Sequence, residues 1–281
     1  MNPVDMDVLT SDVAKLVSLP GIYYRLEDAI NDERKSFDDV SQIIMHDPDL
    51  AARVLRIANS AFYGFPAQIE TITRALTTIG TQQVRDIVLA TSVINAFDGM
   101  PTHLINLKAF WEHSVAVGVT ARVIASWRRE VNIERFYIMG LLHDIGRLVL
   151  YLKMPEAMQQ VLSRRDEKQV MLYRLERETF GFDHAEVGAS LMSVWGLPKT
   201  ICAAVKYHHD PAQTTLSRVD VAVIHVADIM VNSLRMGSSG ERFVPPLDES
   251  AWEVLGLSEN DMPEITGQAQ QQTHEALTLF F

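Results

Sequence analysis

The chain has 281 residues, of which 47% are hydrophobic and 22% charged, and its formal net charge is −11. These proportions are the ordinary balance of a soluble globular protein with a sizeable core. The negative charge argues against broad nucleic-acid binding, because contacts with phosphates need a basic surface. No nucleic-acid partner is therefore expected.

No stretch of the sequence approaches the roughly 18–20 uninterrupted apolar residues that are needed to cross a bilayer. Residues 1–16 carry acidic side chains early and have no basic segment, so we expect no secretory signal. The single cysteine, Cys202, excludes an internal disulfide and fits a reducing compartment. These features predict a cytoplasmic protein without a membrane partner.

Helical periodicity dominates the chain and alternating β-branched runs are scarce, which predicts an all-α fold. In the first part of the chain, helices are predicted at 37–47, 48–58, 71–79 and 81–96. Pro48 suits the first position of the second helix, and Gly80 suits the end of the third. Asn59-Ser60 and Tyr63-Gly64-Phe65-Pro66 are predicted to form a turn region.

Asp98-Gly99-Met100-Pro101 is the clearest break in the first half of the chain. It predicts a boundary between an N-terminal helical lobe (10–100) and a second helical region (105–235). Further helices are predicted at 107–129, 133–152, 155–163, 170–180, 183–195, 198–208 and 217–235. Residues 236–281, which include a glycine- and serine-rich loop at 237–240 and a last helix at 265–279, are expected to pack on the same domain.

Several histidines and aspartates lie on the apolar faces of the predicted helices. His143 and Asp144 stand in an otherwise apolar helix, where a buried carboxylate is costly unless it is paired or coordinated. His113 follows Phe110 at a spacing of three, and Asp228 continues an apolar stripe through Ile224. The full set, from five predicted helices, is His113, His143, Asp144, His184, His208 with its neighbour His209, and Asp228.

Each of these residues also has an ordinary structural explanation. A lone inward histidine is more often a hydrogen-bonded core residue than a metal ligand, and Asp228 could cap a helix or pair with an arginine. One shared cation site would explain why each of the five helices turns a histidine or an aspartate inward. His225 is interpreted as a neighbour of Asp228. The remaining histidines, His46, His103 and His274, are interpreted as surface residues, and Arg122, Arg128 and Arg129 as a solvated helix end.

The order of these histidines and aspartates resembles the HD superfamily of metal-dependent phosphohydrolases, and the flanking residues resemble its HDOD subfamily. The resemblance covers about residues 10–235 and implies an all-α, HD/HDOD-type helical domain, in which an N-terminal lobe packs on an HD-like helical core within residues 1–235. The matching segments are Leu19-Pro20, Asp47-Pro48, Ala58-Asn59-Ser60, Ile79-Gly80, Trp111-Glu112-His113-Ser114, Gly140-Leu141-Leu142-His143-Asp144-Ile145-Gly146, Asp183-His184-Ala185-Glu186-Val187-Gly188, Trp195-Gly196-Leu197-Pro198 and Tyr207-His208-His209-Asp210-Pro211.

The resemblance also implies a ligand set. One metal ion would be held by His113, His143, Asp144 and Asp228, and a second by His184, His208 and His209, with Asp144 bridging the two. Imidazole and carboxylate ligands suit Fe or Mn, with Zn or Ni also compatible, at one or two ions per chain. Arg147 lies one turn after Asp144 and could make a forked contact with a phosphate, so Asp144 and Arg147 are the catalytic candidates.

Two functions from different classes follow from the resemblance. HDOD proteins are generally bacterial signalling components, which implies a regulatory protein whose partner is another signalling protein. The alternative is an active metal-dependent phosphohydrolase or phosphodiesterase that acts on a phosphorylated small molecule or nucleotide. A nucleotide-binding sensor that does not hydrolyse its ligand lies between them.

Three departures disfavour hydrolysis of cyclic dinucleotides. Enzymes of that group usually carry lysine where this chain has Arg147, and the two side chains are not interchangeable at a phosphate. The group also has a Gly-Tyr-Pro sequence where Asp210-Pro211 stands here, and Ala109 offers no glutamate for a third metal ion.

Overall fold

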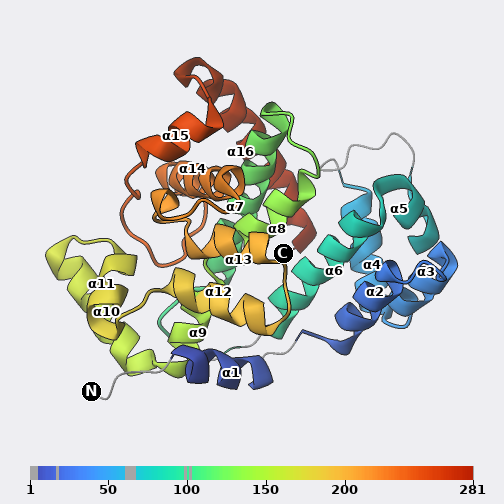
Figure 1. The fold of residues 1–281 in the computed structure, drawn as a ribbon, viewed down its shortest axis with the longest axis horizontal. Helices are drawn as coiled ribbons and strands as arrows, with labels where there is room; N and C mark the ends of the chain where they lie inside the picture. Colours follow the sequence, from blue (N-terminus) through green and yellow to red (C-terminus); the bar gives the residue numbers. More distant parts are fainter. Residues whose placement is uncertain (1–5, 17–18, 61–67, 98–99, 101–102, 281) are drawn as a thin grey trace. The chain divides into compact units, whose positions relative to one another are not determined.

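The computed structural model describes residues 6–16, 19–60, 68–97, 100 and 103–280. Every regular element in these residues is a helix, which confirms the predicted all-α fold (Figure 1). No helix among them is long and apolar enough to cross a membrane. The predicted turn at Tyr63-Gly64-Phe65-Pro66 lies outside the described residues.

The chain forms two compact units, one of residues 1–17 with 99–270 and the other of residues 18–98 with 271–281. The sequence had suggested one lobe for residues 10–100. In the structure α1 (Met6–Leu16) packs on α9 and α12 of the larger unit instead. Neither α1 nor α2 (Gly21–Asn31) was predicted from the sequence.

The smaller unit is built from α2, α3 (Phe37–Met45), α4 (Pro48–Ala58), α5 (Ile72–Ile79) and α6 (Thr81–Ala96). Side chains fix where its helices begin. Ser36 and Asp39 form a capping box at α3, and Asp47 accepts from the backbone N–H of Leu50 at α4. The helix α6 packs against α2, α4 and α5 and carries much of the buried apolar surface.

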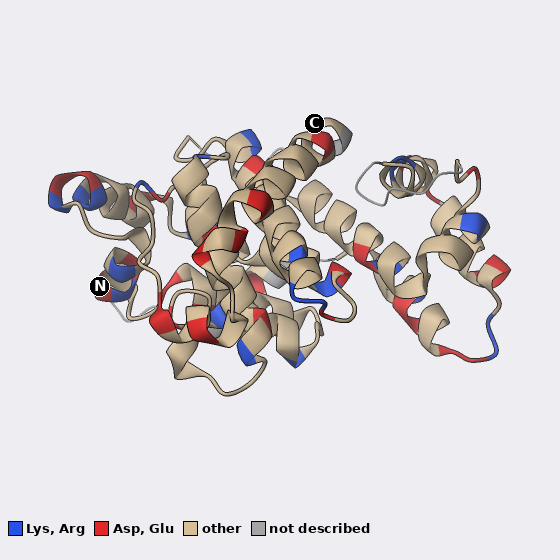
Figure 2. Ribbon diagram, turned by 90° about the horizontal axis from the view of Figure 1, so that it is seen from above, with Lys and Arg blue, Asp and Glu red and all other residues tan. Residues whose placement is uncertain are grey.

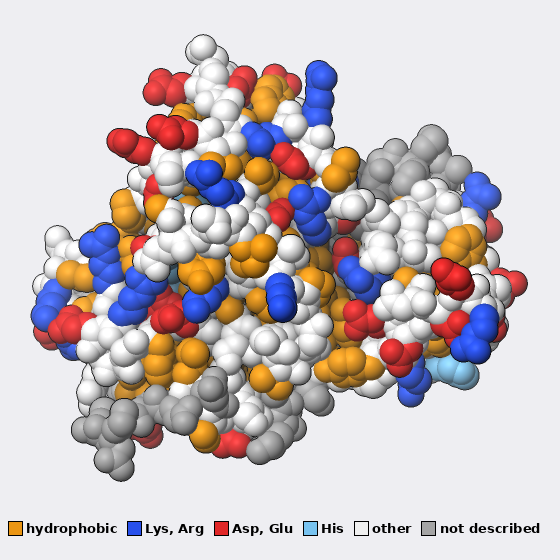
Figure 3. Space-filling model, viewed as in Figure 1, with side chains coloured by type: hydrophobic (Ala, Val, Ile, Leu, Met, Phe, Trp, Pro, Cys, Tyr) orange, Lys and Arg blue, Asp and Glu red, His pale blue; other side chains and the backbone are white. Residues whose placement is uncertain are grey.

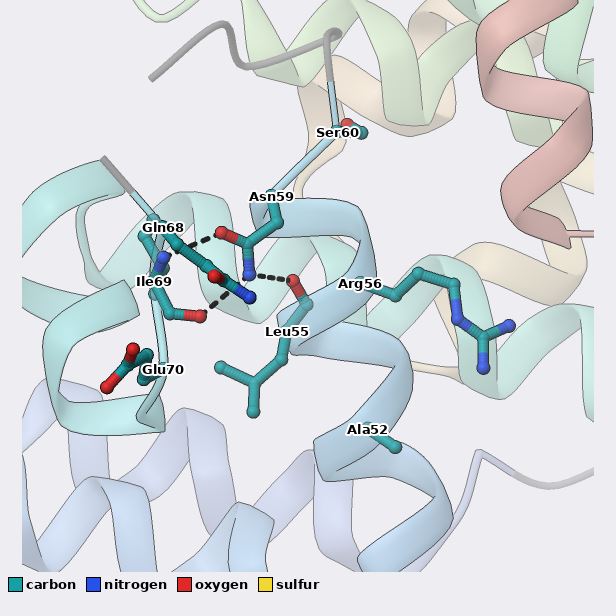
Figure 4. A pocket seen from close by; sticks show the side chains of 8 residues that line it. All are labelled: Ala52, Leu55, Arg56, Asn59, Ser60, Gln68, Ile69 and Glu70. Atoms are coloured by element: carbon teal, nitrogen blue, oxygen red, sulfur yellow. Dashed lines mark hydrogen bonds between the residues drawn. The ribbon is translucent and has the colours of Figure 1, made fainter. Parts of the chain in front are cut away.

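A pocket in the smaller unit surrounds Asn59 (Figure 4). The Asn59 side-chain amide donates to the carbonyl oxygens of Leu55, at 2.8 Å, and Ile69, at 2.7 Å. Its carbonyl oxygen accepts from the backbone N–H of Ile69 at 2.6 Å. The Asn59 amide therefore joins the end of α4 to the segment before α5 by hydrogen bonds. This structural role explains why an asparagine stands at this position.

The larger unit contains the remaining helices, and the long helix α7 (Leu107–Trp127) packs against α8 and α14. The helix α12 packs against α9 and α13. The elements are α8 (Glu134–Leu142), α9 (Ile145–Lys153), α10 (Pro155–Lys168), α11 (Leu172–Phe180), α12 (His184–Val194), α13 (Lys199–Lys206), α14 (Arg218–Leu234), α15 (Glu249–Leu255) and α16 (Met262–Phe280), whose last part belongs to the smaller unit.

The prediction of one helix over 133–152 was wrong, because α8 ends at Leu142 and α9 begins at Ile145. Asp144 leaves the helical conformation, with φ −100° and ψ 6°. The apolar residues on both sides continue without a gap in their pattern, so periodicity alone gives no sign of the break. The interruption places His143 and Asp144 at the junction of two helices.

Glycines allow the closest helix contacts in the larger unit. A Cβ on Gly140 would lie 2.7 Å from the Cα of Gly118, where α8 crosses α7. A Cβ on Gly146 would lie 2.0 Å from the carbonyl oxygen of His184, where α9 meets α12. Side chains at these positions would force the helices apart.

Candidate metal centre

The structure brings the seven predicted ligand candidates together inside the larger unit, in two neighbouring groups. None of them is more than 9% exposed to solvent. One group is His113, His143 and Asp228, and the other is Asp144, His184, His208 and His209. Ligand atoms within each group all lie within 4.8 Å of one another.

The first group gathers around the carboxylate of Asp228. Its Oδ1 atom lies 3.2 Å from the Nε2 atom of His113 and 3.5 Å from the Nε2 atom of His143. The amide of Asn232, one turn later in α14, donates to the same oxygen at 2.7 Å. The sequence pattern does not single out Asn232, although its spacing of four from Asp228 allows this contact.

The second group gathers around Asp144, whose two oxygens face different histidines. Oδ1 lies 2.9 Å from the Nε2 atom of His184 and 3.8 Å from that of His208. Oδ2 lies 3.3 Å from the Nε2 atom of His143, which belongs to the first group. The Nε2 atoms of His184 and His209 are 3.0 Å apart. Asp144 therefore stands between the two groups.

The imidazole rings are held with their Nε2 atoms toward the site. His143 donates from Nδ1 to the carbonyl oxygen of Gly140 at 2.7 Å, and His208 donates from Nδ1 to that of Val205 at 2.6 Å. A proton on Nδ1 leaves the lone pair of a neutral ring on Nε2. This arrangement is typical of histidines that bind metal ions.

Several polar atoms at the centre have no hydrogen-bond partner. They are the Nε2 atoms of His113, His143 and His208. Buried acceptors normally find donors, so convergent acceptors without donors call for a cation. Imidazole nitrogens and carboxylate oxygens suit a divalent transition metal. The residues present therefore fit a divalent metal ion.

The carboxylates set the charge of the surrounding histidines. Burial opposes protonation of His143, yet Asp144 and Asp228 raise its pKa to about 10. Burial and Arg147 also oppose protonation of His184, whose pKa is raised to about 9 by Glu176 and Asp144. Burial and the nearby His143 lower the pKa of His208 to about 3. The metal-free centre thus takes up protons where a cation would otherwise neutralise the carboxylates.

This protonation predicts that metal affinity rises with pH. Because pH 7 is below the pKa of both His143 and His184, both rings are protonated at that pH. Each ring must lose a proton before its Nε2 atom can bind a metal ion. Each displaced proton should weaken binding about tenfold per pH unit as the pH falls. Calorimetric titration of Mn²⁺ at pH 6 to 8, in buffers that differ in ionisation enthalpy, measures the released protons. Binding heats that do not depend on the buffer would contradict this protonation state.

Comparison with known proteins places this site in a family. The HDOD domain family matches residues 16–211, which include both the motifs of the smaller unit and most of the candidate ligands. The chain belongs to the HDOD domain family. Asp228 lies beyond the matched region, so its place in the site rests on its contacts with His113 and His143.

Similar structures support the HDOD fold. An HDOD domain protein of unknown function from Geobacter sulfurreducens is 26% identical, with a TM-score of 0.75 over 94% of this chain and 96% of that one. A protein from Shewanella amazonensis that is provisionally named a phosphohydrolase is 24% identical to this chain. Its TM-score is 0.76 over 97% of this chain and 98% of that one. At that identity the second likeness shows the fold alone.

A curated relative from Treponema pallidum is an uncharacterized protein that is 22% identical over 260 residues. The match covers 92% of this chain but 49% of that protein, so this HDOD chain spans about half the length of its relative.

One face of α11 supports the second ligand group, and none of its residues was predicted to do so. Glu176 is fully buried and accepts from the Nδ1 atom of His184 at 2.6 Å and from its backbone N–H at 2.9 Å. The ring of Tyr173 stacks on that of His209, with centroids 4.2 Å apart. Arg177 pairs with Asp183 and Asp210, at 2.7 and 2.6 Å, beside the two histidine segments. The spacing of 173, 176 and 177 puts these side chains on one helix face.

The available sequence signal for this support was Glu176, a glutamate on an otherwise apolar stripe of the predicted helix.

Removing the charge of Glu176 should weaken metal binding, because its carboxylate holds the His184 ring and makes it more basic. For Glu176→Gln we expect metal affinity about 10- to 100-fold lower than in the wild type, by competition with a chelator. Glu178→Gln is the matched control, since Glu178 lies on the same helix but is exposed. Equal losses in the two variants would contradict the role of Glu176.

His225 is close to the centre but is occupied elsewhere. It donates from Nδ1 to the backbone oxygen of His208 at 2.7 Å, and its Nε2 atom accepts from the backbone N–H of Asp248 at 2.9 Å. It therefore joins the segment that bears two candidate ligands to the beginning of α15. The interpretation of His46, His103 and His274 as surface residues is confirmed, since all three are exposed.

Arg147 lies within the centre and is 1% exposed. Its Nη1 atom donates to the Oγ atom of Ser239 at 2.7 Å and lies 3.5 Å from the Oδ2 atom of Asp144. Ser239 belongs to the loop 237–240, whose Ser238 donates its backbone N–H to the carbonyl oxygen of Ala109 at 2.8 Å. A forked contact between Arg147 and a substrate phosphate stays a prediction, and it would require Ser239 to move.

Proposed function

We propose that this HDOD chain is a bacterial signalling or regulatory protein that retains an HD-type metal centre and acts through another signalling protein. The observation that carries the proposal is the burial of a complete set of ligand candidates. The most exposed of them, His209, has 9% of its surface accessible. Such an enclosed centre suits an ion that stabilises or reports a conformation better than one that must meet a substrate.

The ion in this proposal is a divalent transition metal. Fe and Mn suit its mixed imidazole and carboxylate donors, and Zn and Ni are also compatible. The two groups of ligand atoms offer places for one or two ions per chain. When bound, such an ion would supply a Lewis acid and a positive charge at Asp144.

Elemental analysis of protein purified without chelators or a histidine tag tests the proposal. We expect about one to two equivalents of transition metal, and a rise in the unfolding temperature when metal is added to the apoprotein, because a ligand of the native state stabilises it by mass action. Protein that holds no metal, and takes up none on addition, would overturn the proposed centre. Pull-down of a signalling partner that depends on bound metal would extend the test to the regulatory role.

A second function is supported by the position of Asp144. Its two oxygens face different ligand groups, as expected of a carboxylate shared by two ions in a phosphohydrolase or phosphodiesterase. Asp144 would then position the ions, and Arg147 would bind a phosphoryl oxygen of a phosphorylated small molecule or nucleotide. Metal-dependent turnover in a panel of phosphoesters, lost in Asp144→Asn, would favour this enzyme over the regulatory protein.

The surface charges favour a protein partner over nucleic acid. Basic and acidic residues lie close together on several helices, where blue and red segments adjoin in Figure 2, and the last turns of α10 carry Arg164, Arg165, Asp166 and Glu167. Acidic side chains gather around α15 and the start of α16 in the view of Figure 3. Surfaces of mixed or acidic charge bind phosphates poorly, because phosphates need a continuous basic surface.

A further inference from the structure

Arg147 carries a positive charge into the place where a second metal ion would have to fit. Its Nη2 atom lies 3.3 Å from the Nε2 atom of His184, the atom through which His184 would bind a metal ion. The Nδ1 atom of His184 is already engaged with Glu176, so a metal ion would have to bind at Nε2, which also lies 2.9 Å from the Oδ1 atom of Asp144. A guanidinium at this distance occupies the space beside Nε2, and supplies the positive charge, that a metal ion bound to His184 would bring.

The guanidinium is held in this place from the opposite side. Nη1 donates to both the Oγ atom, at 2.7 Å, and the backbone oxygen, at 3.2 Å, of Ser239. Gly237, with φ +70°, brings this loop against α7 so closely that a Cβ there would lie 2.3 Å from the backbone nitrogen of His113. Arg147 is therefore a fixed part of the centre.

One divalent ion would neutralise the net charge of the buried groups in the centre. Asp144, Asp228 and Glu176 are buried carboxylates that carry three negative charges when ionised. Arg147 contributes one positive charge, which leaves two negative charges when the imidazoles are neutral. Asp183 is also buried but is paired separately with Arg177. A second divalent ion would leave an excess of positive charge in a site closed to solvent, which is energetically costly.

The first ligand group is free of this competition. No contact of Arg147 with His113, His143 or Asp228 occurs in the described residues, whereas the Oδ2 atom of Asp144 faces both Arg147 and His143. On the basis of the proposed metal centre, we propose that Arg147 takes the place of a second cation, so that the chain binds a single metal ion between His113, His143, Asp144 and Asp228.

The stoichiometry of Mn²⁺ binding tests this inference on the full chain, after removal of metal and reloading. We expect about one equivalent in the wild type by elemental analysis, and an electron paramagnetic resonance signal of isolated Mn²⁺ without coupling between ions. Arg147→Met removes a positive charge and leaves the buried carboxylates with an excess of negative charge. In this variant we expect about two equivalents of Mn²⁺ and the signal of a magnetically coupled pair of ions. Arg147→Lys keeps the charge and should remain at about one equivalent.

Each outcome decides between the proposals. About two equivalents in the wild type would overturn the role of Arg147 while leaving the metal centre intact, and this result does not depend on any variant folding. No metal in the wild type would overturn the centre itself and this inference with it. An Arg147→Met protein that is folded by circular dichroism and still binds a single ion would show that the arginine charge does not exclude the second.

Discussion

Replacing Asp144 by asparagine is expected to abolish stoichiometric metal binding. The substitution keeps the size of the side chain but removes the charge of the one carboxylate that faces both ligand groups. We expect metal affinity at least about 100-fold lower than in the wild type, since the loss of a direct ligand should exceed the 10- to 100-fold loss caused by supporting residues. Elemental analysis after purification and a chelator competition assay measure the effect.

Asp220→Asn is the control for Asp144→Asn. Asp220 is also mostly buried and belongs to α14, but it pairs with Arg135, at 3.0 Å, outside the centre. We expect normal metal content in that variant. An Asp144→Asn protein that keeps a full equivalent of transition metal would show that Asp144 is not a ligand.

Replacing Gly146 by alanine is expected to cause a large loss of stability. The added Cβ would lie 2.0 Å from the carbonyl oxygen of His184 and 2.6 Å from the backbone nitrogen of Gly188, and neither backbone atom can turn away. Separating α9 from α12 should cost about 3 kcal/mol or more, which corresponds to a fall in Tm of about 6–12 °C. Thermal unfolding of the apoprotein, with chelator present, measures this effect without a contribution from metal.

Gly267→Ala provides the matched control. Gly267 lies within α16, and a Cβ there meets no atom within 4 Å. Alanine has the higher helix propensity, so we expect this variant to be as stable as the wild type or more stable by up to about 1 kcal/mol. If Gly146→Ala unfolds at the same temperature as Gly267→Ala, the close contact between α9 and α12 is not a feature of the protein in solution.

The contact at Gly146 links stability to the site. The carbonyl oxygen next to it belongs to His184, and Asp144 lies two residues before it. The separation of α9 and α12 therefore fixes the distance between these two candidate ligands, 2.9 Å from Oδ1 to Nε2. A glycine is needed here for the geometry of the centre as well as for packing.

The amino-acid sequence was enough to predict the fold class, the family and the set of residues that come together. Helical periodicity revealed most of the helices, because a buried face repeats every three to four residues and is visible along the chain. The same repeat showed that His113, His208 and Asp228 point inward, and the order of motifs connected them to a known family. Composition alone would not have separated these histidines from His46 or His274.

The break between α8 and α9, the support from α11 and the partner of Arg147 could be seen only in the folded protein. Apolar residues run through the break, so periodicity cannot detect it. Glu176 and His184 lie on different helices, and Arg147 and Ser239 are 92 residues apart along the chain. Contacts of that kind depend on how helices and loops pack, which no local pattern encodes. The charge balance of the centre follows from those contacts, since it depends on which charged groups are buried side by side.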